Sequence, residues 1–350
     1  MGSVKDVEVL KAPKEKEMGI ARFVFSDRYS VFDWGAMPDR IENKGAALCL
    51  MGAYCFEKAE ERGINTHYRG VVTEEGRVVC LDEIEEPTNV MEIDLVRVFH
   101  PRRSNGKYDY SVFTPNLTNF LLPLEVIYRN ALPKGSSVFR RLNAGEITLK
   151  DLGLTRYPKP GERLEKPVVD VSTKLEERDR YVTWDEARKL AGLKEEEADE
   201  IRETLLRIND LITEIAEKAG MVNEDGKVEF AFDPERRLMV ADVIGTPDEC
   251  RFTYKDFPVG KEILREFYRS TPWYGEVEKA KRDAEAKHVA EWRTLCASQP
   301  PRVDKELLEI VSHIYTSAAN EVLGRRMFDS PKLDEAVKRY SEWVESARNG

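Results

Sequence analysis

Residues 222–251 carry charged side chains in a pattern that could bind a metal ion and a nucleotide. Two apolar segments flank Asp233 and the proline after it, which predicts two antiparallel strands joined by a turn. Lys227 and Glu229 are two residues apart, so both side chains would leave the same face of the first strand. Asp242 lies near the end of the second strand. Carboxylates hold Mg²⁺ together with phosphate oxygens, and a lysine neutralises phosphate charge, so this hairpin predicts a site for Mg²⁺ and a nucleoside triphosphate.

Three polar segments before the hairpin could bind the anionic groups of a substrate. Glu125 and Arg129 share one face of the apolar segment 123–130, and buried charges are costly unless they are paired or hold a ligand. Ser136 lies in a Gly-Ser turn followed by two arginines, which could hold a phosphate, although a plain surface turn explains it equally well. Lys44 opens a predicted helix, where free backbone N–H groups favour an anion, but an ordinary helix start is the simpler interpretation.

Five further residues extend the set of candidates. Arg251 follows a Thr-Pro-Asp turn just after the hairpin and could bind an anion. Lys261 and Arg265 lie four residues apart on one face of a predicted helix, where a solvated surface would also explain them. Asp33 and Lys174 lie in polar loops that, taken alone, are interpreted as a turn and a solvated loop.

Composition argues against several classes of protein. The 350 residues carry 65 acidic and 55 basic side chains, and the net charge of −10 argues against general nucleic-acid binding. No apolar run approaches the roughly 18–20 residues that a membrane span needs, and the N-terminus has no apolar signal segment. We therefore expect a soluble cytoplasmic protein. The five cysteines form no Cys-x-x-Cys pair, the histidines have no metal-like spacing, and His67 is expected to be structural.

The hydrophobic pattern indicates strands early in the chain, and helices together with the hairpin later. This order favours an α+β fold over a doubly wound sheet. A segment rich in proline and glycine at 152–167 is interpreted as a linker or a crossing loop. Strands are expected at 7–10, 20–25, 68–72, 77–81, 95–99 and 121–130, and helices at 44–62, 195–219, 262–268, 277–295, 304–323 and 331–348.

Taken in their order, these segments resemble the SAICAR synthetase (phosphoribosylaminoimidazole-succinocarboxamide synthase) family. No single segment is specific for the family, but the ordered set is, and it covers about residues 20–275. The matching segments are Ser26–Asp33, Lys44-Gly45, Gly63–His67, Pro123–Asn130 with Gly135-Ser136, Ser172–Lys174, Asp225–Phe230, Asp242–Arg251 and Lys261–Arg265.

The resemblance implies a two-lobed fold and a reaction. A β-rich ATP lobe would occupy residues 1–122, an α+β lobe residues 123–275, and added C-terminal helices residues 276–350. The family joins L-aspartate to the carboxylate of 5-amino-1-(5-phospho-D-ribosyl)imidazole-4-carboxylate through an acyl phosphate. The products are SAICAR, ADP and phosphate, and the step belongs to purine biosynthesis. The expected partners are these small molecules, with no nucleic acid and no membrane, and a homo-oligomer is left open.

The resemblance also implies a role for each candidate residue. Glu229 and Asp242 would hold Mg²⁺ on ATP, and Lys227 would neutralise charge near the transferred phosphoryl group. The implied catalytic residues are Lys227, Asp242 and Arg251, the implied ATP contacts are Glu229, Lys174 and Lys11, and the implied substrate contacts are Asp33, Lys44, Arg129, Ser136, Lys261 and Arg265.

Two features depart from the family pattern. The Gly-Lys-x-Lys/Arg turn that covers the ATP phosphates in the family is absent, and Lys11, Lys14 and Lys16 are alternatives for its lysine. Val243 stands where the family usually has a glutamate. These departures suggest a divergent branch, with an archaeal one as the candidate. Two other functions stay open: a paralogous ligase with another carboxylate substrate, and a non-catalytic protein that binds a phosphorylated metabolite.

Overall fold

The N-terminal part of the chain forms an antiparallel sheet that one helix covers. The computed structural model describes residues 4–104, 107–133, 135–176, 179–287, 289 and 291–349. Alternate residues of the second strand, Ala21, Phe23 and Phe25, are buried in the same core as the helix α1 (Lys44–Glu61). The strands of this N-terminal sheet, in spatial order, are β1 (Lys5–Lys11), β2 (Gly19–Phe25), β5 (Val90–Leu95), β3 (Tyr68–Val72) and β4 (Val78–Val79).

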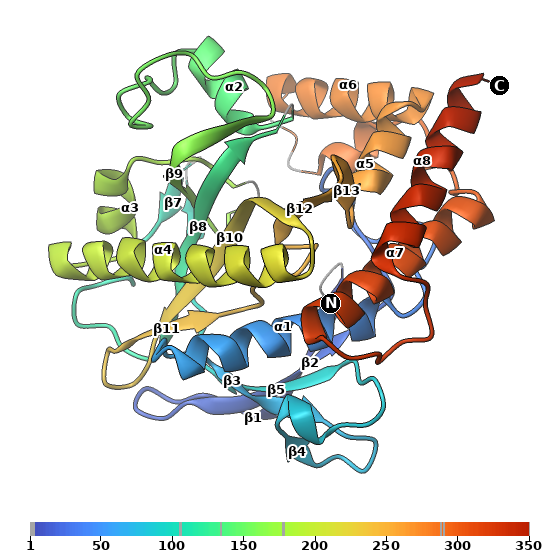
Figure 1. Ribbon diagram of the computed structural model, residues 1–350. Helices are drawn as coiled ribbons and strands as arrows, with labels where there is room; N and C mark the ends of the chain where they lie inside the picture. Colours follow the sequence, from blue (N-terminus) through green and yellow to red (C-terminus); the bar gives the residue numbers. More distant parts are fainter. Residues whose placement is uncertain are drawn as a thin grey trace.

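Six strands form a second antiparallel sheet, which we call the large sheet. The helix α4 (Glu195–Lys218) lies across it (Figure 1), and its apolar stripe, which includes Ile201, Leu205 and Ile208, is buried in the core. The strands, in spatial order, are β13 (Phe257–Val259), β12 (Cys250–Tyr254), β10 (Val222–Phe232), β8 (Phe120–Leu132) and β9 (Glu162–Thr173), with β11 (Leu238–Ala241) paired to β10.

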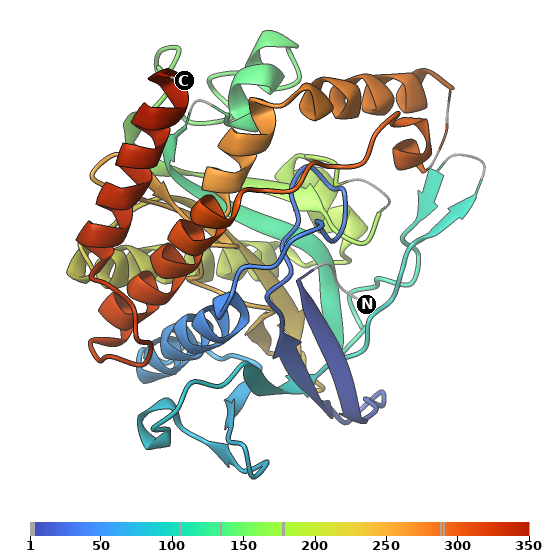
Figure 2. The ribbon, with the colours of Figure 1, turned by 90° about the vertical axis from the view of Figure 1, so that its right-hand side faces the viewer.

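The second half of the chain adds helices beside both sheets. The helix α7 (Lys305–Leu323) runs alongside α1 and α8 (Leu333–Asn349) (Figure 2). Within the described ranges, no helix is both long and apolar enough to cross a membrane. The remaining elements are η1 (Leu81–Glu83), β6 (Arg102–Ser104), β7 (Lys107–Asp109), α2 (Ser137–Asn143), α3 (Trp184–Leu190), α5 (Glu262–Arg269), α6 (Pro272–Lys287) and η2 (Trp292–Leu295).

Backbone hydrogen bonds tie the two sheets together at the start of β3. The amide of His67 donates to the carbonyl of Val240 at 3.0 Å, and the amide of Val240 donates to the carbonyl of Asn65 at 2.9 Å. The amide of Leu121 donates to the carbonyl of Arg97 at 2.9 Å. Because Val240 belongs to β11, these bonds fix the end of the hairpin beside the N-terminal sheet.

The α+β fold and the hairpin are confirmed, and two expected boundaries are wrong. β10 and β11 are antiparallel and end at the expected turn. The strand expected at 95–99 is wrong, because β5 ends at Leu95, which pairs with Gly19 at the first residue of β2. The expected linker is strand in its last part, since β9 begins at Glu162 and pairs there with Leu132.

The helix expected at 277–295 begins earlier and is shorter. It starts at Pro272, a residue type favoured in the first helical turn, and ends at Lys287. The expected domain boundaries at 122/123 and 275/276 fall inside β8 and α6. The division into three domains itself stays a prediction.

Candidate active site

Register in the large sheet brings four charged side chains together. Glu229 of β10 lies directly opposite Glu125 of β8. The amine of Lys227, two residues before Glu229, lies 2.9 Å from Glu125 Oε1 and 3.4 Å from Glu229 Oε1. Lys174 follows the end of β9, and its amine pairs with Glu229 and lies 3.5 Å from Glu125. The spacing of two between Lys227 and Glu229 therefore places them on one face, as the sequence predicts.

Asp242 joins this group from the end of the hairpin. It adopts a left-handed conformation with φ of 61°, which is uncommon for a residue other than glycine. Its carboxylate pairs with the amine of Lys5 from β1, and its carbonyl lies 2.9 Å from Nε2 of His67. The ring of His67 is buried and packs edge-on against Phe23, as a structural histidine would. We call Lys5, Glu125, Lys174, Lys227, Glu229 and Asp242 the charged cluster.

Burial and mutual repulsion set the protonation of the carboxylates in the charged cluster. Burial, and next the charge of Asp242, raise the pKa of Glu229 to about 7. Burial alone would also raise the pKa of Asp242, but the ammonium groups of Lys5, Lys227 and Lys174 bring it well below its usual value. Lys174 pairs with Glu229, and the charges of Lys227 and Lys174 also lower the pKa of Asp242, so the same lysines act on both carboxylates.

The donor chemistry of these two carboxylates fits a Mg²⁺ ion. Mg²⁺ prefers hard oxygen ligands and is usually bound by one or two carboxylates together with phosphate oxygens. A divalent cation beside Glu229 and Asp242 would offset the repulsion that raises the pKa of Glu229. The lysines that pair with them here, Lys174 and Lys5, would be free to contact the phosphates instead.

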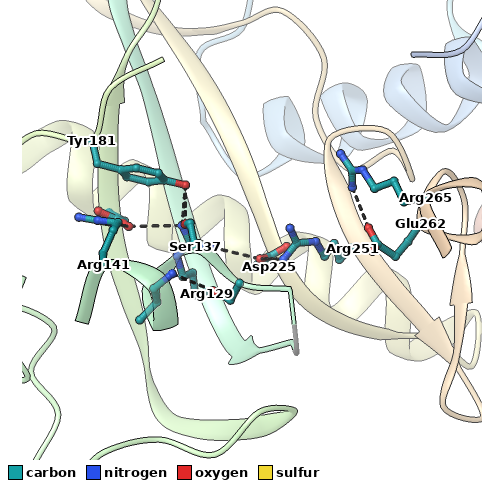
Figure 3. Close-up of polar contacts among 11 residues, drawn as sticks. Arg129, Ser137, Arg141, Tyr181, Asp225, Arg251, Glu262 and Arg265 are labelled. Atoms are coloured by element: carbon teal, nitrogen blue, oxygen red, sulfur yellow. Dashed lines mark hydrogen bonds and ion pairs between the residues drawn. The ribbon is translucent and has the colours of Figure 1, made fainter. Parts of the chain in front are cut away.

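A cavity of about 220 Å³ adjoins the charged cluster, and five cations and five carboxylates line it. Arg251 lies 2.9 Å from Asp225, and Arg129 lies 3.4 Å from the same carboxylate, as Figure 3 shows. Nε of Arg129 is buried and has no hydrogen-bond partner among the described residues. Five of the predicted site residues line this cavity, which we call the anion cavity: Arg129, Lys227, Arg251, Lys261 and Arg265.

Carboxylates pair with several cations of the anion cavity, so a bound anion would compete with them. Arg265 pairs with Glu262 at 2.8 Å (Figure 3). Burial lowers the pKa of Lys261, and so does the charge of Arg265, although Asp248 opposes this shift. An anionic ligand would stabilise the charged form of Lys261, so the cavity is suited to a phosphate or a carboxylate.

Four predicted site residues lie neither in the charged cluster nor in the lining of the anion cavity. Lys44 is fully buried, and its amine pairs with Asp248 at 2.9 Å, so it contacts the protein interior. Ser136 caps α2, with Oγ accepting from the amide of Val138 at 3.4 Å. The other two are Asp33, which is exposed and pairs with Lys281 at 2.8 Å, and Lys11, which pairs with Glu17 and is half-exposed.

Some positions that the sequence analysis considers lie outside the described residues. They are Lys134, next to the Gly-Ser turn, residues 177–178, in the loop after Lys174, and His288.

Sequence reasoning missed residues that the structure places at the site. Lys5 is the N-terminal lysine that reaches the charged cluster, yet no spacing rule connects it with Asp242, which is 237 residues away. Glu249 pairs with Lys227 at 3.1 Å and lines the anion cavity. The sequence does single out Glu125, which shares a face with Arg129 in an apolar strand and needs a partner, but it assigns Glu125 no role in the site.

β1 also presents an exposed apolar strip on the face that carries Lys5. Val7 and Val9 follow Lys5 at spacings of two and four and are 51% and 56% exposed. In the sheet they lie opposite Phe23 and Ala21, whose side chains are buried. The strip is therefore an extension of the core-facing side of the N-terminal sheet that α1 does not cover.

Comparison with known proteins points to one family. The SAICAR synthetase family model matches residues 2–285. A protein of Archaeoglobus fulgidus, provisionally named phosphoribosylaminoimidazole-succinocarboxamide synthase, is 51% identical over 345 residues, which are 99% of this chain and 100% of that protein. The phosphoribosylaminoimidazole-succinocarboxamide synthase of Thermoplasma acidophilum is 31% identical over 311 residues, which are 87% of this chain and 93% of that protein.

Solved structures share the fold. SAICAR-synthase from Saccharomyces cerevisiae, complexed with SAICAR, aligns with a TM-score of 0.62 and 18% identity, over 93% of this chain and 94% of that chain. A SAICAR synthetase (type 2) in complex with ADP aligns with a TM-score of 0.59 and 20% identity, over 93% of this chain and 97% of that chain. By the family match and the 51% identity to the archaeal relative, the chain belongs to the SAICAR synthetase family.

Proposed function

We propose that this chain joins L-aspartate to the carboxylate of 5-amino-1-(5-phospho-D-ribosyl)imidazole-4-carboxylate, with ATP as the energy source. The products are SAICAR, ADP and phosphate. One observation carries the proposal: Lys227 belongs both to the charged cluster and to the lining of the anion cavity. A phosphoryl group held at the cluster and a carboxylate held in the cavity would therefore meet at one ammonium group.

The charged cluster suits a nucleotide triphosphate with Mg²⁺. Glu229 and Asp242 would hold the Mg²⁺, which neutralises phosphate charge when it is bound. Lys174 and Lys5 would contact phosphate oxygens, so Lys5 replaces Lys11 as our proposed N-terminal phosphate ligand. The exposed strip of Val7 and Val9 shares the face of Lys5 and would pack against the adenine base.

The anion cavity suits the ribotide. Arg129 and Arg251 flank Asp225, and their guanidinium groups can bind phosphate or carboxylate oxygens in pairs. Lys261 and Arg265 add charge from the segment that begins α5. Of the predicted contacts outside the cavity, Asp33 and Ser136 remain proposals, and we propose that Lys44 acts indirectly through Asp248.

In this reaction the protein chiefly positions the reacting groups and neutralises the charge of the phosphates. A carboxylate oxygen of the ribotide attacks the γ-phosphorus of ATP, the bond to ADP breaks, and an acyl phosphate forms. The amine of aspartate then attacks the acyl carbon, an amide bond forms, phosphate leaves and the amine loses a proton. Lys227 carries its proton before the substrates bind, because Glu249, Glu229 and Glu125 outweigh the effect of burial and raise its pKa well above the usual value. It can therefore stabilise charge on the transferred phosphoryl group.

A coupled ADP-release assay tests the proposal. With ATP, Mg²⁺, the ribotide and L-aspartate present, we expect turnover, and we expect it to stop when any one component is omitted. Glu229→Gln should lower the turnover rate at least about 100-fold, the scale of losing one key electrostatic contact. Glu214→Gln is the matched control, since Glu214 pairs with Arg62 on the exposed side of α4.

The same assay separates the two alternatives. Binding of ATP without turnover of these substrates would favour a ligase for another carboxylate. The N-terminal segment, which lacks the family's turn over the ATP phosphates, motivates this alternative. No binding of ATP at all would favour a protein that only binds a phosphorylated metabolite. Full activity of Glu229→Gln would contradict the assignment of the charged cluster.

A further inference from the structure

A buried charge network connects the turn after the hairpin to the C-terminal helix α7. Asp248 lies in this turn and is 7% exposed. Its Oδ2 lies 2.9 Å from the amine of Lys44, at the start of α1, and its Oδ1 accepts a hydrogen bond from the hydroxyl of Tyr315 in α7 at 2.7 Å. Lys44 and Tyr315 are both fully buried, so the network joins three distant parts of the chain in the interior.

The network is charged at neutral pH. Burial would raise the pKa of Asp248, but the nearby ammonium groups of Lys44 and Lys261 lower it to about 2. The pKa of Tyr315 is raised well above its usual value by burial and by Asp248, so its hydroxyl stays a hydrogen-bond donor. A buried carboxylate that loses one of its partners is strongly destabilised, so each contact constrains the position of Asp248.

Asp248 is followed at once by residues of the anion cavity. Glu249 pairs with Lys227 at 3.1 Å, and Arg251 pairs with Asp225 at 2.9 Å. The amine of Lys261 also donates to the carbonyl of Asp248. A displacement of Asp248 would therefore move Glu249 and Arg251 and disturb a third cation of the cavity.

We propose that Tyr315 is a positioning residue, whose hydroxyl holds Asp248 and thereby sets the segment 246–251, the turn and the start of β12, against the anion cavity. Tyr315 lies beyond residues 2–285, which the family model matches. The inference rests on the proposed function for the identity of the ligand in the cavity. It assigns α7, part of the C-terminal segment 276–350, a role in binding the ribotide, because a shift of about 1 Å in a binding group can reduce a rate on the order of a hundredfold.

Tyr315→Phe tests this role, because it keeps the ring and removes only the hydroxyl. In hydrogen–deuterium exchange we expect the amides of 246–251 to exchange faster, including those of Glu249 and Cys250, which donate to the carbonyl of Thr246 at 3.1 and 2.8 Å. In the ADP-release assay we expect the KM for the ribotide to rise on the order of tenfold. The KM for ATP should stay within about twofold, since none of the charged-cluster contacts of Lys5 or Lys174 changes.

Tyr340→Phe is the matched control. Tyr340 is buried in α8, and its hydroxyl donates to Glu266 at 2.9 Å, outside the lining of the anion cavity. The control should leave exchange in 246–251 and the KM for the ribotide unchanged. Tyr315→Met provides a second variant if Tyr315→Phe fails to fold, because it also removes the hydroxyl, fills the space with a flexible side chain and keeps the pair of Lys44 and Asp248.

The two readouts separate failure of this inference from failure of the proposed function. Unchanged exchange in 246–251, or an equal rise in the KM values for ATP and the ribotide, would overturn the positioning role. If the wild-type protein shows no turnover with these substrates, the proposed function fails, and faster exchange confined to 246–251 still supports the positioning role.

Discussion

The position of Lys5 shows how a single residue can replace a missing sequence motif. Its amine pairs with Asp242, and it stands over the ring of Phe23 at 4.6 Å from the ring centroid. Lys11, at the other end of the same strand, pairs with Glu17 near the surface. Lys5 lies opposite Phe25 at the start of β1, whereas Lys11 lies at the other end of the strand, after a register shift, so the pairing of β1 with β2 decides which lysine lies beside the charged cluster.

Lys5→Met should lower kcat/KM for ATP on the order of a hundredfold, because it removes one cation beside the phosphates and leaves Asp242 without that partner. Lys11→Met is the matched control and should change kcat/KM by less than about threefold, since an exposed ion pair contributes little. Steady-state kinetics with varied ATP measures both variants. A larger loss of kcat/KM in Lys11→Met than in Lys5→Met would instead assign the phosphate contact to Lys11.

Individual site residues were predictable from the sequence where local geometry governs them. The spacing of two between Lys227 and Glu229 fixes their common face in any strand, and their contact follows from it. Burial was not predictable in the same way. Lys44 stands at a helix start, which indicates an anion site, but only the packing of α7 against α1 shows that its amine faces Asp248 in the interior.

Among the elements, β1 is an edge strand, and one of its faces carries the side chains that we propose contact ATP. This face carries Lys5, Val7 and Val9, and within the described residues β2 is the one strand that pairs with β1. Exposed apolar side chains beside a cluster of cations and carboxylates form a surface suited to a flat apolar base with an anionic tail.

Val9→Asp should raise the KM for ATP on the order of tenfold and leave the KM for the ribotide within about twofold, because a carboxylate would disfavour both the base and the phosphates. Val78→Asp is the control: Val78 is also exposed and lies in β4, at the opposite edge of the same sheet. Equal effects of the two substitutions on ATP would show that the strip of β1 does not contact the nucleotide.

Elements whose apolar side chains repeat with a clear period were predictable from the sequence. Strands whose length depends on a neighbouring strand were not. The hairpin and α4 follow from alternation and from a helical apolar stripe. Val96, Val98 and Phe99 are apolar as well, but β2 offers this segment no partner beyond Gly19, and instead Arg97 makes an isolated bridge to Phe120 of the large sheet. A strand needs a neighbour for its backbone groups, and the sequence does not show where that neighbour ends.

At the scale of the whole molecule, the charged cluster draws on both sheets. Lys5 comes from the N-terminal sheet, whereas Glu125, Lys227 and Glu229 come from the large sheet. The bonds between Val240 and residues 65 and 67 hold the two sheets in register at this point. A ligand that contacts Lys5 and Glu229 together would therefore join the two sheets further.

ATP with Mg²⁺ should raise the free energy of unfolding by about 2.7 kcal/mol when its concentration is a hundred times the Kd. Differential scanning fluorimetry would detect this as a higher Tm. ATP with a chelator should give a much smaller increase, because Glu229 and Asp242 would then repel the phosphates. An equal increase with and without Mg²⁺ would contradict the assignment of these carboxylates as metal ligands.

The link between Asp248 and Tyr315 has a consequence for synthesis of the chain on the ribosome. Translation produces Lys5 first, the hairpin much later and α7 later still. Both sheets can therefore assemble while α7 is still inside the exit tunnel, and Asp248 then faces the interior without the Tyr315 hydroxyl. We expect nascent chains arrested before α7 to be more sensitive to protease around 246–251 than the released protein.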